Sequence, residues 1–159
     1  METISMNDKL ISRPGFARFL ALGAALIGTS RPAAAASVRH HIVFHVDRNE
    51  PATMNLLLNN IANVTTYYSG VGEPVDVEVV AYGPGLHMLR EDTSPVKERL
   101  TSIKASIPEV IFSACGVTMK GMEKAEGHPI SLVPQARIVP AGVVRLTQLH
   151  EQGWTYIKP

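Results

Sequence analysis

The sequence contains a single cysteine, Cys115, among 159 residues. One cysteine cannot close a disulfide within its own chain, so a small disulfide-bonded scaffold is excluded. Its thiol is therefore buried and inert, paired with another chain, or reactive. Because it is the only thiol, any cysteine chemistry of this protein must take place at Cys115.

The sequence also lacks an excess of positive charge and any phosphate-binding motif. From Ser37 onward it has 11 Lys and Arg against 12 Asp and Glu, a net charge of −1 with neutral histidines, which disfavours nucleic-acid binding. Neither G-x-G-x-x-G nor G-x-x-x-x-G-K-[ST] occurs, and the loop 47–51 has two acids and no glycine, which argues against a nucleotide cofactor. We therefore expect no cofactor.

Residues 1–36 have the pattern of a cleavable export signal. Arg13 and Arg18 precede an apolar stretch over 19–28, which is too short to span a bilayer, and four alanines end the segment at Ala36. We predict cleavage after Ala36, by the Sec route or by a degenerate twin-arginine route in which Pro14 replaces the second arginine. An uncleaved N-terminal anchor is the alternative. Residues 37–159 would then form one periplasmic domain, and no later run is long enough to span a membrane.

The remaining sequence alternates between apolar strand-like runs and amphipathic helical segments. Strands are expected over 41–46, 75–82, 110–115, 137–139 and 154–157; helices are expected over 51–69, from Ser94 to about 107, over 117–124 and over 141–152. Ser94 is expected to be the N-cap of the second helix, with Pro95 at its first position. This alternation predicts an α/β fold, a three-layer αβα sandwich with a mostly parallel sheet of about five strands and flavodoxin-like or related topology.

In such a sheet, binding sites form beyond the carboxyl ends of the strands, which is where Cys115 lies. It ends the third strand, and a helix N-terminus there would favour its thiolate. Lys120 could lower the thiol pKa further by its charge, and His87 or His128, on loops at the same edge, could act as a base. The opposite interpretation is a buried inert thiol beside a solvated lysine and exposed histidines.

Several other chemistries are disfavoured by spacing. A cysteine phosphatase needs an arginine six residues after the cysteine, where this chain has Gly121, and the loop lacks the arginines of a rhodanese-type anion cradle. Among the histidines of the first strand, His41 and His45 share a face but lie about 13 Å apart, too far to bind one metal ion. We therefore expect no metal site there.

Three stretches of the chain together resemble the DsrE/DsrF-like proteins of sulfur oxidation and sulfur relay. They are V-A-Y-G-P-G at 80–85, F-S-A-C-G-V-T-M-K at 112–120, and V-P-A-G-V-V at 139–144 with G-W-T-Y-I-K-P at 153–159. The resemblance implies a three-layer αβα fold, a homo-trimer or homo-hexamer, and a persulfide on Cys115 that is exchanged with sulfur donor and acceptor proteins.

The characterised relay members are cytoplasmic, whereas this chain has an export signal. Our leading expectation is a periplasmic sulfur carrier or sulfurtransferase-type protein, a carrier more than a turnover enzyme. The alternative is a non-catalytic module that binds a small ligand or a protein and has an inert Cys115.

Overall fold

The computed structural model describes residues 38–159, so the predicted export signal lies outside the described residues. Five parallel strands form one sheet in the order β4-β3-β2-β1-β5. They are β1 His40–Val46, β2 Val75–Ala81, β3 Ile111–Cys115, β4 Ala136–Val139 and β5 Thr155–Ile157. The expected five-stranded parallel sheet is confirmed. The strand order differs from the flavodoxin order 2-1-3-4-5, so the fold is a related three-layer sandwich that does not have flavodoxin topology.

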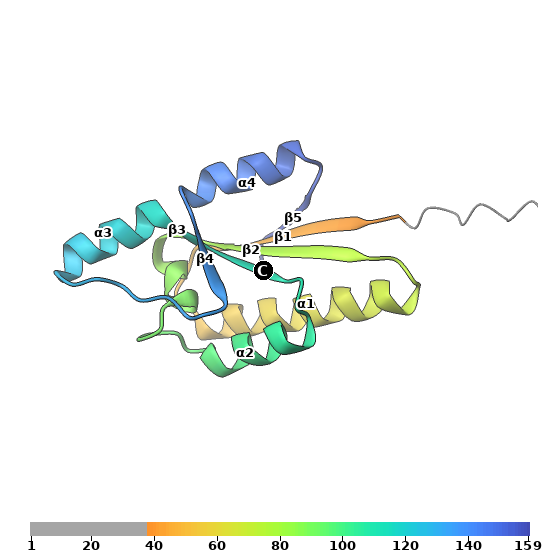
Figure 1. Ribbon diagram of the computed structural model, residues 1–159, viewed down its shortest axis with the longest axis horizontal. Helices are drawn as coiled ribbons and strands as arrows, with labels where there is room; N and C mark the ends of the chain where they lie inside the picture. The colour runs from red at the N-terminus through yellow and green to blue at the C-terminus, as the bar shows by residue number, and fades with distance from the viewer. Residues whose placement is uncertain (1–37) are drawn as a thin grey trace, which may run out of the picture. The chain divides into compact units, whose positions relative to one another are not determined.

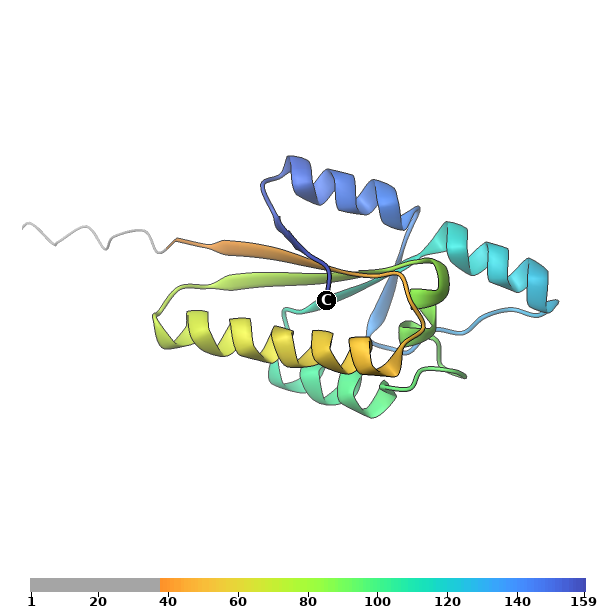
Figure 2. The same ribbon diagram turned by 180° about the vertical axis from the view of Figure 1, so that it is seen from behind.

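The helices cover both faces of this sheet. Helices α1 Pro51–Gly70 and α2 Lys97–Ser106 lie on one face, and α4 Gly142–Glu151 lies on the other, as Figure 1 and the reverse view in Figure 2 show. The strand order explains this arrangement. The first crossovers step from β1 to β2 to β3, whereas the last returns from β4 to β5, and right-handed crossovers in opposite directions place their helices on opposite faces.

The two faces differ in polarity. Toward α1 and α2, fully buried side chains such as Phe44, Val79 and Phe112 pack against the apolar face of α1. Beneath α4, the apolar cluster contains only Val43, Val80 and Leu149 as its buried members. The buried polar side chains His45, Glu78 and Ser113 alternate with the first face along their strands, so they lie on the α4 side. The buried polar side chains of the sheet therefore lie on the face that α4 covers.

The segment between β2 and α2 differs from our expectation. A 3₁₀ helix, η1 Gly83–Leu89, follows β2, and α2 begins at Lys97. Ser94 is not its N-cap: the Ser94 hydroxyl donates to the Met88 carbonyl at 2.6 Å, and the residue before the helix is Val96. Ser94 therefore closes the preceding loop instead.

The two glycines of the G-P-G motif in η1 have separate backbone roles. Gly83 adopts a positive φ of 51°, which favours glycine. A Cβ on Gly85 would collide with the Val46 carbonyl and lie 2.8 Å from the Asp47 nitrogen. The absence of a side chain at Gly85 thus lets η1 pack directly on the end of β1.

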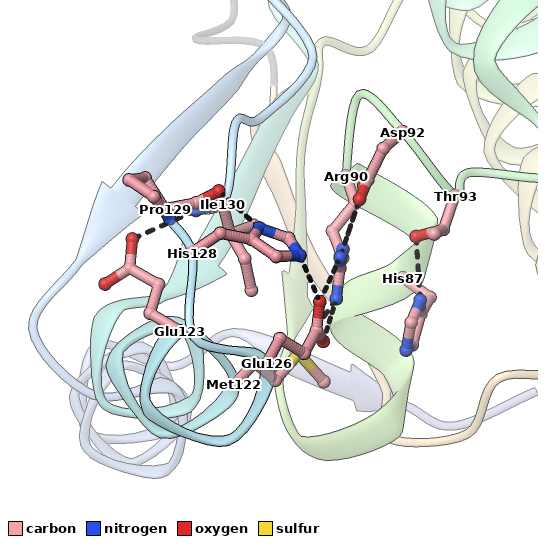
Figure 3. A network of polar contacts seen from close by, with 10 residues as sticks. All are labelled: His87, Arg90, Asp92, Thr93, Met122, Glu123, Glu126, His128, Pro129 and Ile130. Carbon is pink, nitrogen blue, oxygen red and sulfur yellow. Dashed lines mark hydrogen bonds and ion pairs between the residues drawn. The ribbon is translucent and has the colours of Figure 1, made fainter.

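A buried arginine joins η1 to α3 Gly116–Glu126, as Figure 3 shows. The Arg90 side chain is 2% exposed, and its guanidinium donates to both carboxylate oxygens of Asp92 at 2.9 and 2.7 Å. It also donates to both oxygens of Glu126, at 2.6 and 2.8 Å. The hydrogen bonds from Arg90 hold the pKa of Asp92 at about 2. Because Glu126 is the last residue of α3, Arg90 fixes the far end of the helix whose first turn contacts Cys115.

Across residues 38–159, no helix combines the length and apolar character that crossing a bilayer would require.

Candidate functional site

The Cys115 sulfur lies between the N-termini of two helices. Cys115 is the last residue of β3 and the N-cap of α3, and its Sγ accepts a hydrogen bond from the Thr118 N–H at 3.4 Å. The Gly142 N–H, in the first residue of α4, donates to the same sulfur at 3.1 Å. Helix N-termini carry a partial positive charge, so both helices stabilise negative charge on this atom.

These contacts outweigh the effect of burial on the thiol. Burial opposes ionisation of Cys115, but the Thr118 hydroxyl and the backbone N–H groups of Thr118, Gly142 and Val117 hold its pKa below the ordinary value. The residue is 5% exposed. The site thus combines a thiol whose pKa lies below the ordinary cysteine value with narrow access from solvent.

Thr118 links the sulfur to the loop after β2. The Gly83 N–H donates to the Thr118 hydroxyl oxygen at 3.0 Å. Because a backbone N–H can only donate, the Thr118 oxygen is the acceptor and its own hydrogen is available for the sulfur. The Thr118 hydroxyl thus accepts a hydrogen bond from the loop after β2 and also helps to hold the pKa of Cys115 below its ordinary value.

Two glycines allow close packing at the first residues of α3 and α4. A Cβ on Gly142 would lie 2.9 Å from Tyr82 Cδ1 and 3.3 Å from Cys115 Cβ, closer than ordinary contact. A Cβ on Gly116 would lie 3.1 Å from the Val139 carbonyl oxygen. The glycines of the C-G and P-A-G motifs are thus explained by close packing around Cys115.

An aromatic and histidine cluster borders the site on its β1 side. The Tyr82 ring, which touches the Gly142 position, stacks on His45 with ring centroids 4.5 Å apart. His45 Nδ1 lies 2.7 Å from the Tyr156 hydroxyl, and within residues 38–159 its Nε2 has no hydrogen-bond partner. Burial lowers the pKa of His45, against the opposing charge of Asp47, so the ring is neutral at pH 7.

The position of His45 beside the thiol site was not predicted from the sequence, where this histidine was considered only as a metal ligand. Its position at the carboxyl end of β1 was the available signal. No three His, Cys, Asp or Glu side chains within the described residues gather closely enough to hold a metal ion.

The structure places the other predicted site residues away from the sulfur contacts just described. Lys120 is exposed on α3, and it is not among the main groups that shift the pKa of Cys115. His87, in η1, is partly buried, and its Nδ1 lies 2.7 Å from the Thr93 hydroxyl oxygen (Figure 3). His128 is exposed and pairs with Glu126 at 3.4 Å. The groups that contact the sulfur are instead Thr118 and Gly142.

Comparisons with known proteins find similarity to a solved structure. No family model matches the chain, and no curated protein matches it. A solved structure does: the protein of unknown function MTH1491 from Methanobacterium thermoautotrophicum, with 30% sequence identity and a TM-score of 0.64 over 76% of this chain and 99% of that one. The chain therefore belongs to the same family as the MTH1491 protein and shares its α/β fold.

Proposed function

We propose that this protein is a DsrE-like carrier of sulfane sulfur, in which Cys115 accepts a sulfur atom as a persulfide. The observation that carries the proposal is the position of Sγ between the N-termini of α3 and α4, with hydrogen bonds from Thr118 and Gly142. The resemblance of the motifs around Cys115 to the DsrE/DsrF-like proteins supports it. The name of the MTH1491 protein states no function, so the sulfur chemistry rests on the site and the motifs.

The chemistry requires only the thiolate and a sulfane-sulfur donor. The Cys115 thiolate attacks the terminal sulfur of a polysulfide, a new S–S bond forms, and the donor's S–S bond breaks. The shortened polysulfide leaves with the electron pair of that bond. The negative charge then rests on the outer sulfur of the persulfide, beside the partial positive charge of the two helix ends.

The burial of Cys115 favours the alternative function, a non-catalytic binding module. With 5% exposure, Cys115 has the accessibility of an inert core thiol, as expected of a non-catalytic module that binds a small ligand or a protein. The two functions differ in whether the folded protein reacts at the sulfur.

The intact mass of the folded mature protein, measured with and without polysulfide, separates the two. A carrier gains about 32 Da for each sulfur atom bound to its nucleophilic thiolate. Cys115→Ser, of similar size, should keep the fold and gain nothing. If wild-type Cys115 gains sulfur and reacts with iodoacetamide only after unfolding, the carrier function is refuted and the binding module is favoured. Lys120→Ala and His87→Ala test two further candidates, because a role in catalysis predicts slower sulfur uptake at unchanged stability.

The proposal includes export and self-association. Protein recovered from the periplasm should begin at Ser37, and a full-length cytoplasmic product would contradict export.

Exposed apolar side chains lie close to the Cys115 turn: Val117 at 64%, Ile138 at 57% and Val143 at 63%. We propose that these side chains belong to a self-association surface, so light scattering should report a closed trimer or larger assembly. A monomer at micromolar concentration would contradict it.

A further inference from the structure

A buried carboxylate organises two arginines beneath and beside α4. Glu78, on β2, is fully buried and accepts hydrogen bonds from the Ser113 hydroxyl at 2.7 Å and from Arg137 Nη2 at 3.0 Å. Arg145, on α4, donates to both of its oxygens, from Nε at 2.8 Å and from Nη2 at 2.6 Å. Burial opposes ionisation of Glu78, but these donors hold its pKa below the ordinary value, so it is ionised at neutral pH.

This cluster has one negative and two positive charges. Arg137 donates from Nε to the Ser113 hydroxyl oxygen at 3.1 Å and from Nη2 to Glu78. Arg145 donates from both Nε and Nη2 to Glu78. Within residues 38–159, neither Nη1 group donates to a protein acceptor. One full positive charge is therefore uncompensated, and the two guanidinium groups are held in place by Glu78.

A cavity of about 300 Å³ lies along β4 and α4, and both arginines line it. Gln148 is its other polar side chain with donors, and Ile138 and Val144 are among its apolar walls. None of the residues that line it carries a carboxylate. The smaller cavity of about 260 Å³ beside His45 differs in this respect, since it is lined by Asp47 and Glu50 as well as Arg48 and Lys158. Of these two cavities, the one with Arg137 and Arg145 is suited in charge to an anion.

We propose that this cavity binds a small tetrahedral or pyramidal oxyanion, held by the remaining N–H groups of Arg137 and Arg145. Guanidinium groups bind such anions through charge-assisted hydrogen bonds, and two prearranged groups lose little side-chain entropy on binding. The cavity adjoins the thiol site: Ala141, in its wall, precedes Gly142, and Val139 pairs with Cys115 across β3 and β4. Identifying the anion as a sulfur oxyanion rests on the proposed function, whereas anion binding itself does not.

Titration calorimetry at fixed ionic strength tests the site with four anions, namely sulfate, sulfite, thiosulfate and phosphate, and with planar acetate as the comparison. We expect saturable one-site binding of tetrahedral or pyramidal oxyanions that acetate does not reproduce. Tighter binding of sulfite or thiosulfate than of phosphate identifies a sulfur oxyanion, and the reverse order identifies phosphate. The same titrations on Cys115→Ser should be unchanged, which separates this site from the carrier function.

Arg137→Gln is the decisive variant, because Arg137 is half exposed and Arg145 still neutralises Glu78 in its absence. The anion affinity should fall about tenfold, the effect of losing a hydrogen bond from a charged donor. Lys124→Gln, which removes one exposed positive charge from the last turn of α3, is the matched control and should bind as the wild type does. Circular dichroism confirms the fold of each variant. The proposal is overturned if Arg137→Gln binds as tightly as the wild type, if Lys124→Gln weakens binding equally, or if acetate binds equally well.

Discussion

Gly142→Ala should separate the Cys115 sulfur from the N-terminus of α4. The new Cβ would lie 2.9 Å from Tyr82 Cδ1, 3.0 Å from Tyr82 Cβ and 3.3 Å from Cys115 Cβ. Tyr82 cannot move aside freely, because its ring stacks on buried His45. The start of α4 must therefore shift by about 0.5–1 Å to restore ordinary carbon contacts, at a cost of about 1–3 kcal/mol in the free energy of unfolding.

The same shift removes a hydrogen bond from the thiolate. The Gly142 N–H to Sγ distance is 3.1 Å, and an added shift of about 0.5–1 Å weakens this contact strongly. Since a hydrogen bond to a charged group contributes about 1.5–3 kcal/mol, the thiolate population, and with it the rate of alkylation below neutral pH, should fall by about tenfold. Urea unfolding measures the first effect, and iodoacetamide kinetics on the folded protein measure the second.

Gly121→Ala is the matched control. Gly121 lies inside α3, and a Cβ there would have no neighbour within 4 Å. Alanine at this position should stabilise the protein by about 0.5–1 kcal/mol and leave alkylation unchanged. If folded Gly142→Ala alkylates as fast as the wild type, the N-terminus of α4 does not contribute to thiolate stability.

Three further predictions concern the surroundings of the site. Thr118→Val should lower the free energy of unfolding by about 1–3 kcal/mol, because it leaves the Gly83 N–H without its acceptor, and should slow alkylation, because it removes the hydroxyl that lowers the pKa of Cys115. Thr118→Ser should restore both stability and alkylation rate, and equal effects of the two variants would contradict this. Arg90→Met should lower the free energy of urea unfolding by about 1.5–3 kcal/mol, because it removes the charge-assisted hydrogen bonds of a buried guanidinium to two partly exposed carboxylates, and a loss under about 0.5 kcal/mol would refute that role. Burial lowers the pKa of His45 in the folded state, so the unfolded chain takes up this proton first as pH falls below about 6.5. Unfolding free energy should therefore decrease as pH falls below about 6.5, and His45→Gln should flatten this decrease; an unchanged slope in the variant would show that another group causes it.

The elements of the fold could be predicted because their signals are local. Apolar residues at helical spacing marked α1, and continuous apolar runs marked β2 and β3. The strand order could not be predicted from local sequence patterns, because it depends on which strand the last strand joins, and here β5 joins the edge of β1. The 3₁₀ helix η1 was missed because a seven-residue segment shows too few turns for a periodic pattern.

The site was predicted only as far as the chain near Cys115 determines it. A strand followed directly by glycine and a helix placed the thiol at a helix N-terminus, and the structure has that arrangement. The second N–H donor, Gly142, lies 27 residues further on, so only tertiary packing brings it to the sulfur. Lys120 follows Cys115 by five residues, which is about 140° around a helix, and its side chain leaves the helix on a different side.

The outer edge of β1 is completed by a strand far away in the sequence. Strand β5 is three residues long and pairs with β1, and His45 and Asp47 contact Tyr156 and Lys158 across a separation of 111 residues. Closing so large a loop costs more entropy than joining neighbouring strands, so these contacts are expected to form late in folding. Until then the edge of β1 can pair with a foreign strand, which makes the partly folded chain vulnerable to aggregation before His45 reaches its buried position.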